Sequence, residues 1–212
     1  MPSLRLEASV ADVRKRVIYS TTRAMRSKAP MEQLVTKARD EANRATRYFL
    51  RVEPPNPPLA CHEGCSNCCS QRVRASVPEV LAVAAFIRVN FEPDRIACIL
   101  EQLPMRSRGW HGERCALLKD GRCSVYEVRP LVCQGHTGVN PADCHRVNHV
   151  VWLPQDHTFK AASEAIAAGL ARGGLRREMV EFATALRIAL SESDAERRYF
   201  DGEDVFAASR LP

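Results

Sequence analysis

Apolar residues at helical spacing predict two long amphipathic helices at the start of the chain. The first stripe consists of Leu6, Val10, Val13 and Val17. Its gaps of three and four residues indicate a helix over roughly residues 4–27. The second stripe, which predicts a second long helix, consists of Met31, Leu34, Val35, Ala38, Ala42, Ala45 and Phe49. This helix must end before Pro54, because the proline-rich stretch 54–58 favours a stiff, extended linker.

Shorter helices are predicted in the second part of the chain. Ser76 and Glu79 have the spacing of a capping box, and the apolar run at residues 80–89 indicates a buried helix. A further short helix is expected over residues 93–103. Cys98 lies off the apolar stripe of that helix and is therefore interpreted as a bystander thiol.

The C-terminal part is expected to form a helical pair over residues 159–170 and 175–190, separated at Gly173-Gly174. Asp194 is placed to cap one last helical turn.

Residues 110–151 are irregular and rich in turn signals such as Asp120-Gly121. Short hairpin strands are expected near residues 116–118 and 123–126. The predicted fold class is mainly α, with an irregular cysteine-rich metal-binding region and short β-hairpins. We expect a single compact domain plus an N-terminal helical arm.

Three segments follow from this organisation. Residues 1–55 form a basic helical arm, residues 56–155 form a cysteine-cluster metal-binding domain, and residues 156–212 form C-terminal helices packed on it. The 212 residues are 45% hydrophobic but only 6% aromatic, and 26% are charged, which is typical of a soluble globular protein with an aliphatic core. No apolar run is long enough to cross a membrane, so no membrane contact is expected.

The compartment determines how the nine cysteines are interpreted. Glu7 and Asp12 stand where a signal peptide would have its apolar run, so a cytoplasmic location is expected. Thiols stay reduced there, and metal ligation becomes the expected role of clustered cysteines.

Positive charge is concentrated at the start of the chain. Residues 1–51 hold twelve Lys or Arg and five acidic residues, whereas the rest is close to neutral. Such a segment is typical of proteins that bind nucleic acid or another acidic partner. The charges are interleaved with acids and lack stacking aromatics, which is more typical of solvated helix faces.

The densest chemical signal is the sequence CHEGCSNCC at residues 61–69. It places four thiols in one short loop: Cys61, Cys65, Cys68 and Cys69. Thiolates are soft ligands for zinc and iron, and the short gaps allow one loop to wrap an ion or cluster. The loop therefore predicts a metal site.

A second set of cysteines lies in the irregular segment: Cys115, Cys123, Cys133 and Cys144. The eight cysteines suffice for two four-thiolate centres, or for one cluster and one ion. Vicinal Cys68 and Cys69 favour two centres, because neighbouring side chains in extended backbone point to opposite sides. Whether His136 or His145 replaces a cysteine stays open, since imidazole also binds zinc.

The cysteines recur with characteristic neighbours: CALL at 115–118, GRCSVYEVRPLVC at 121–133 and NPADC at 140–144. With the first loop, this pattern resembles the YkgJ-type cysteine-cluster family, a zinc- or iron-chelating domain, over roughly residues 60–155. The first gap holds three residues where the family commonly has two. The resemblance implies metal binding and no settled activity.

Two other residues of the pattern have a physical interpretation as outer-shell groups. Arg129 precedes Cys133 by four residues, so its guanidinium can offset thiolate charge or donate to a sulfur. Tyr126 can pack over the site, with core packing as the alternative for both residues.

The leading interpretation is a metal-binding protein with one or two zinc, iron or iron-sulfur centres, at least partly structural. The spacing of Cys61, Cys65 and Cys68 also occurs in radical S-adenosylmethionine enzymes, but those require a barrel of alternating strands and helices. Flagellin lysine N-methylase carries a similar cluster, so a redox or methyltransfer enzyme is an alternative. No glycine-rich cofactor loop supports it.

Overall fold

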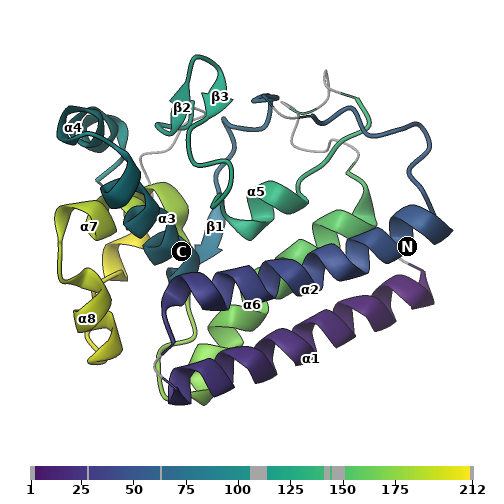
Figure 1. The fold of residues 1–212 in the computed structure, drawn as a ribbon, viewed down its shortest axis with the longest axis horizontal. Helices are drawn as coiled ribbons and strands as arrows, with labels where there is room; N and C mark the ends of the chain where they lie inside the picture. Colours follow the sequence, from purple (N-terminus) through teal and green to yellow (C-terminus); the bar gives the residue numbers. More distant parts are fainter. Residues whose placement is uncertain are drawn as a thin grey trace.

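A computed structural model describes residues 3–27, 29–62, 64–105, 114–140, 144 and 151–210. Three long helices, α1 (Leu4–Arg26), α2 (Met31–Val52) and α6 (Leu153–Arg172), pack against one another as a bundle. They occupy the lower part of Figure 1. The bounds of α1 and α2 agree closely with the helices predicted from their apolar stripes.

Burial of the predicted stripes explains why these helices form a bundle. All seven apolar positions of the α2 stripe are buried, as are Leu6, Val13 and Val17 of α1. A Cβ at Gly169 of α6 would lie only 2.5 Å from the Cβ of Thr21 in α1. The absence of a side chain at Gly169 therefore allows α1 and α6 to approach closely.

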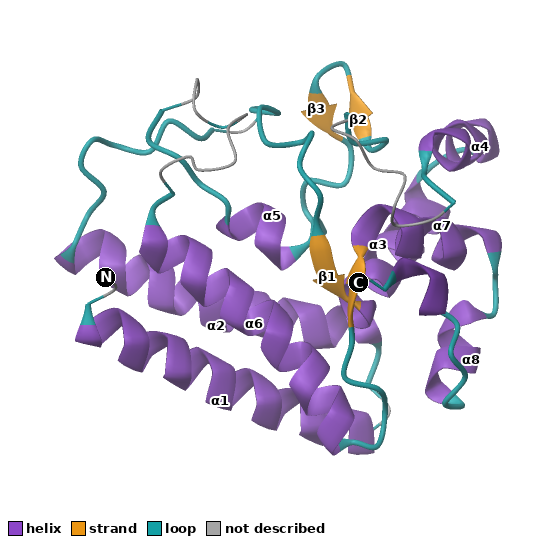
Figure 2. Cartoon of the chain, turned by 180° about the vertical axis from the view of Figure 1, so that it is seen from behind, coloured by secondary structure: helices purple, strands orange, loops and turns teal. Residues whose placement is uncertain are grey.

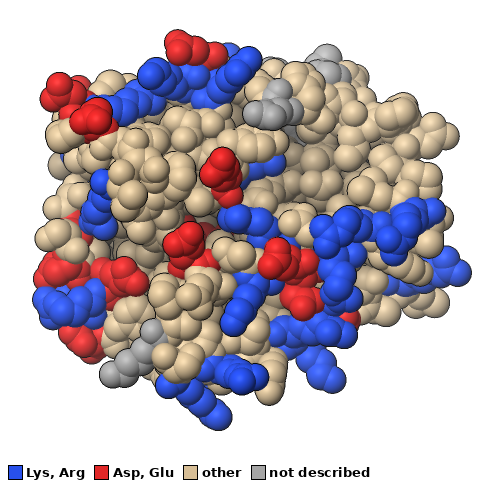
Figure 3. Space-filling model, in the orientation of Figure 1, with Lys and Arg blue, Asp and Glu red and all other residues tan. Residues whose placement is uncertain are grey.

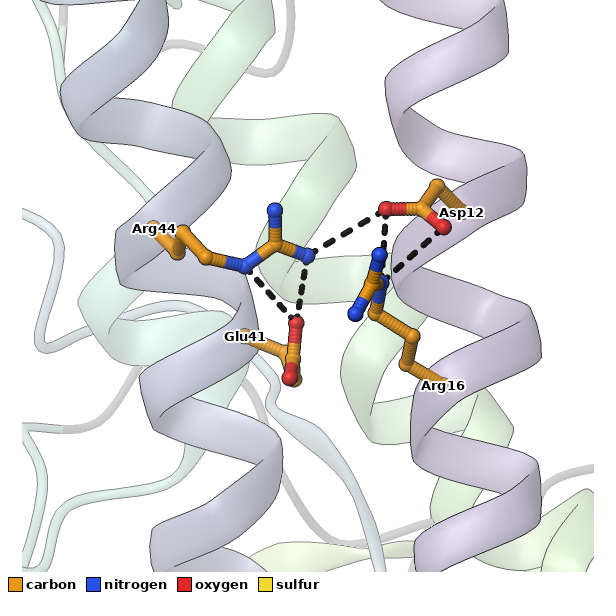
Figure 4. Close-up of polar contacts among 4 residues, drawn as sticks. All are labelled: Asp12, Arg16, Glu41 and Arg44. Carbon is orange, nitrogen blue, oxygen red and sulfur yellow. Dashed lines mark hydrogen bonds and ion pairs between the residues drawn. The ribbon is translucent and has the colours of Figure 1, made fainter.

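An ion-pair network on the bundle surface joins α1 to α2, as shown in Figure 4. Arg44 in α2 pairs with Glu41 at 2.6 Å and reaches Asp12 in α1 at 3.2 Å. Asp12 also pairs with Arg16 at 2.8 Å. Figure 3 shows basic and acidic side chains interspersed over the face formed by α1 and α2. Part of the positive charge of residues 1–51 is therefore used within the fold.

A second group of helices packs beside the bundle. It comprises α3 (Val77–Asn90), α4 (Pro93–Gln102), α7 (Phe182–Ser191) and α8 (Ala195–Phe200), followed by the 3-10 turn η3 (Ala207–Ser209). Helix α3 contacts both α2 and α7, so a continuous apolar core extends through the described residues. Pro93 opens α4 and Asp194 precedes α8, as expected, although Asp194 makes no side-chain cap.

The strand β1 (Arg74–Ser76) pairs antiparallel with β4 (Met179–Glu181), placing Arg74 opposite Glu181. The prediction of a helix from residue 175 is therefore wrong for its first seven residues. The carboxylate of Glu181 accepts hydrogen bonds from Ala183 N at 3.1 Å and Thr184 N at 2.8 Å. This cap fixes the start of α7 immediately after the strand.

The predicted hairpin is present as β2 (Leu118–Lys119) and β3 (Arg122–Cys123), with strands shorter than expected. Asp120 and Gly121 have φ values of 51° and 77°, the left-handed pair that a tight two-residue hairpin turn requires. The mainly helical fold class with a cysteine-rich region and short strands is confirmed.

A five-residue helix, α5 (Leu131–Gly135), was not predicted from the sequence, and it packs against α6. Figure 2 shows this helix between the bundle and the loops, which gather on the side opposite α1. Within the described part of the chain, no helix is both long and apolar enough to cross a membrane.

Candidate metal centre

The first cysteine loop is a succession of tight turns. Cys65 N donates to the carbonyl of His62 at 3.1 Å, and Cys69 N donates to that of Ser66 at 3.0 Å. Gly64 has a φ of 86°, a conformation that side chains disfavour. The expectation of extended backbone at Cys68 and Cys69 is wrong, because turns bend the chain there. The two side chains therefore need not point to opposite sides, and their adjacency no longer favours two centres.

The second set of cysteines is fastened to this loop through the backbone. Cys115 N donates to the carbonyl of Cys69 at 2.8 Å, which joins segments 46 residues apart. Cys123 lies on β3, opposite Leu118 of β2. Cys133 lies on α5, whose first backbone N–H, at Leu131, is capped by the side chain of Glu79 at 2.8 Å.

These segments enclose a small cavity of about 80 Å³. Six of the eight predicted ligands line it: Cys65, Cys68, Cys69, Cys115, Cys123 and Cys133. Arg129 also lines the cavity, so the structure gathers a thiol-rich wall beside one cation. A volume of this size suits an ion or a small cluster rather than an organic molecule, since small-molecule pockets usually exceed about 300 Å³.

Cys61 and Cys144 do not line the cavity. The Cys61 sulfur accepts a hydrogen bond from Gly138 N at 3.2 Å. Cys144 is buried, and its carbonyl accepts a hydrogen bond from the Gln71 side chain at 2.9 Å. Their role as ligands stays a prediction.

Cys98 lies on α4, away from the cavity lining, where Gln102 Nε2 lies 3.3 Å from its sulfur. The bystander interpretation is consistent with this position. His136 lines a neighbouring cleft rather than the cavity, and His145 lies outside the described residues.

The arrangement is not that of a finished coordination shell. Among the described residues, no three Cys, His, Asp or Glu side chains are already placed as a metal ion would hold them. None of the nine cysteines, all of which are described, forms a disulfide. The structure therefore shows thiols gathered around a cavity, and ligation requires several of them to turn inward.

Burial is the main influence on the pKa of three of the cavity thiols, Cys115, Cys123 and Cys133. It raises the pKa of Cys115 to about 11 and raises that of Cys133 well above its ordinary value. The pKa of Cys68 is raised first by its hydrogen bond with Cys69 and then by burial. The nearby charge of Arg129 acts in the opposite direction on the pKa of Cys68, Cys123 and Cys133. A cation in the cavity would oppose burial in the same way.

Arg129 and Tyr126 form a pair beside the cavity. The guanidinium carbon of Arg129 lies 4.0 Å from the centroid of the Tyr126 ring, which is a cation–π contact. The Nε of Arg129 is buried and has no hydrogen-bond partner among the described residues. This geometry is compatible with the predicted roles of both residues beside the metal ligands.

Glu181 also lines the cavity, and sequence reasoning missed it. Its side chain is 1% exposed and is held by the cap at the start of α7. The Glu-x-x-Thr spacing of Glu181 and Thr184 was the only available signal, and it indicates a helix cap rather than a site. Pairing between β1 and β4 is what brings this distant residue to the cysteines.

Comparison with known proteins finds a family similarity in the central part of the chain. No curated protein and no solved structure matches the sequence. Residues 60–158, a little under half of the chain, match the family model CxxCxxCC, described as a putative zinc- or iron-chelating domain. This match confirms the resemblance drawn from the cysteine pattern. Residues 60–158 are therefore similar to the CxxCxxCC family.

Proposed function

We propose that this protein binds zinc or iron through thiolates of the cysteine cavity, and that the centre is at least partly structural. The single observation that carries the proposal is the convergence of six cysteines, from two distant chain segments, on one cavity of about 80 Å³. The description of the family supports the same chemistry.

The donors fit such a metal. Four of the thiols lie on different parts of the site: Cys68 on the first loop, Cys115 on the segment hydrogen-bonded to that loop, Cys123 on β3 and Cys133 on α5. Four thiolates are the usual shell of a structural zinc and of iron-sulfur clusters. Cys65 and Cys69 provide further thiols in the same wall. When bound, the metal would supply the charge that keeps buried thiolates ionised and would cross-link the two segments.

Arg129 has a defined part in this proposal. Four thiolates around a divalent cation leave a net negative charge in a buried site, which is costly unless it is compensated. The guanidinium lines the same cavity and has an unpartnered, buried Nε among the described residues. We assign to it the compensation of thiolate charge, with Tyr126 holding its orientation.

The number of centres is part of the proposal. One centre at the cavity is the arrangement that the geometry favours, because both vicinal cysteines line the same space. A second ion near Cys61 and Cys144 is the alternative that the count of eight cysteines suggests. A cytoplasmic site fits the free state of all nine cysteines.

The visible spectrum of anaerobically purified protein tests the nature of the metal. Zinc has a filled d shell and gives no visible absorption, whereas an iron-sulfur cluster gives a coloured protein. A colourless protein with stoichiometric zinc supports the structural centre. A coloured, reducible protein would direct attention to the redox alternative.

A further inference from the structure

A second opening, with a volume of about 410 Å³, lies against the cysteine cavity and shares Cys68 and Cys133 with it. We call it the basic cleft. Its described walls come from residues 68–74, from α5 and from the first turns of α6. It is large enough for a small organic molecule, whereas the cysteine cavity is not.

The charged side chains that line the basic cleft are mainly cationic: Arg72, Arg74 and Lys160, with Asp156 as the one described acid. Asp156 is already paired with Lys160 at 3.4 Å. Three cationic side chains and one acid leave an excess of positive charge along this described lining.

The backbone explains why two guanidinium groups share the basic cleft. Arg74 is the first residue of β1, Arg72 precedes it by two positions, and both line the cleft. Side chains two positions apart share one side of an extended backbone. Both arginines are exposed, while the following Ala75 is buried. Paired guanidinium groups present the planar donors that carboxylate and phosphate groups prefer.

We propose that the basic cleft binds a small molecule through a carboxylate or phosphate group, held by Arg72 and Arg74 beside Cys68 and Cys133. The inference adds a ligand site to the proposed metal function, and it rests on that function because the bound molecule would lie beside the metal. A ligand bound there would meet the metal site through the two shared cysteines, because the cysteine cavity has no room for it.

The test is calorimetric titration of the full-length, metal-loaded protein with inorganic phosphate and, separately, with acetate. We expect saturable binding of at least one probe, weakened about tenfold or more in the Arg72→Gln/Arg74→Gln variant, since that variant loses the charge-assisted hydrogen bonds of both guanidinium groups. Phosphate and acetate distinguish the two anion chemistries. Arg47→Gln, an exposed arginine on α2, is the matched control and should bind the probes normally.

Metal content is measured on every variant, which separates this inference from the proposed function. Loss of probe binding with unchanged metal supports the basic cleft as an anion site. Absence of binding by the parent protein, or equal binding by both variants, overturns the inference even if metal is present. A further outcome is that the parent protein binds phosphate without holding any metal, while the double variant does not bind phosphate. In that outcome the anion site stands and the metal function fails.

Discussion

The carboxylate of Glu79 in α3 accepts a hydrogen bond from the backbone N–H of Leu131, two residues before Cys133, at 2.8 Å. The same carboxylate accepts from Ser76 N at 2.8 Å, from the Ser76 hydroxyl at 2.6 Å and from the hydroxyl of Ser163 in α6. One buried side chain therefore fixes the short cysteine-bearing helix relative to α3 and α6.

Glu79→Gln should destabilise the protein. All four partners are donors, so the amide NH₂ would replace an acceptor and leave at least one buried donor unpaired. We expect a loss of about 2–3 kcal/mol in the free energy of unfolding, measured by urea titration. Glu101→Gln, an exposed residue of α4, is the control and should change little. Unchanged unfolding of Glu79→Gln would contradict the assigned role of the carboxylate.

Gly135→Ala should disturb α5 specifically. A Cβ at this position would lie 2.6 Å from the Cβ of Phe159, so α5 must shift away from α6. We expect about 1–3 kcal/mol of destabilisation and weaker metal binding, because Cys133 is on the same helix. Gly169→Ala crowds α1 against α6 instead, so it should lower stability while leaving metal content per folded molecule unchanged. Equal metal loss in both variants would mean that the effect is global.

The metal-free protein should lose stability at alkaline pH. Burial raises the folded-state pKa of several thiols, to about 11 for Cys115, above the unfolded value near 8.5. The neutral thiol is favoured in the fold, so this contribution is complete below about pH 8.5 and declines as the pH rises toward 11. Urea midpoints measured under reducing conditions, with and without chelator, should diverge in this range. Identical pH profiles would show that metal does not hold these thiols ionised.

Removal of the metal by a chelator should leave most of the helical circular dichroism. The bundle has its own core, with Val17, Ala38 and Ile166 fully buried. The segment around the cavity has short elements and many turns, so ligation rather than burial must hold it together. Protease cuts are predicted within residues 105–150, parts of which lie outside the described residues. Complete loss of helix on chelation would contradict this separation.

The sequence predicted the two long N-terminal helices well because their signals are local. The stripe from Met31 to Phe49 alone defines a helix and its buried face. It could not predict β4 or the place of Glu181, because these depend on pairing with β1, more than one hundred residues earlier. Helix α5 was missed because five residues give no periodicity, and its cap comes from Glu79 in another helix.

The candidate site was predicted by residue type rather than by position. Cysteine spacing identified six residues that the fold brings to one cavity, but it gave no reason to separate them from Cys61 and Cys144. The turn at Cys68 and Cys69 also escaped prediction, because it depends on backbone hydrogen bonds within residues 62–71.

The measurement that tests the central claim most directly is elemental analysis of anaerobically purified protein and of its Cys133→Ser and Cys98→Ser variants. We expect about one zinc or iron centre per chain in the parent and in Cys98→Ser, and a marked loss in Cys133→Ser, since Cys133 lines the cavity and Cys98 does not. Less than about half a metal atom per parent chain, with all nine thiols titrating freely in the native state, would contradict the account.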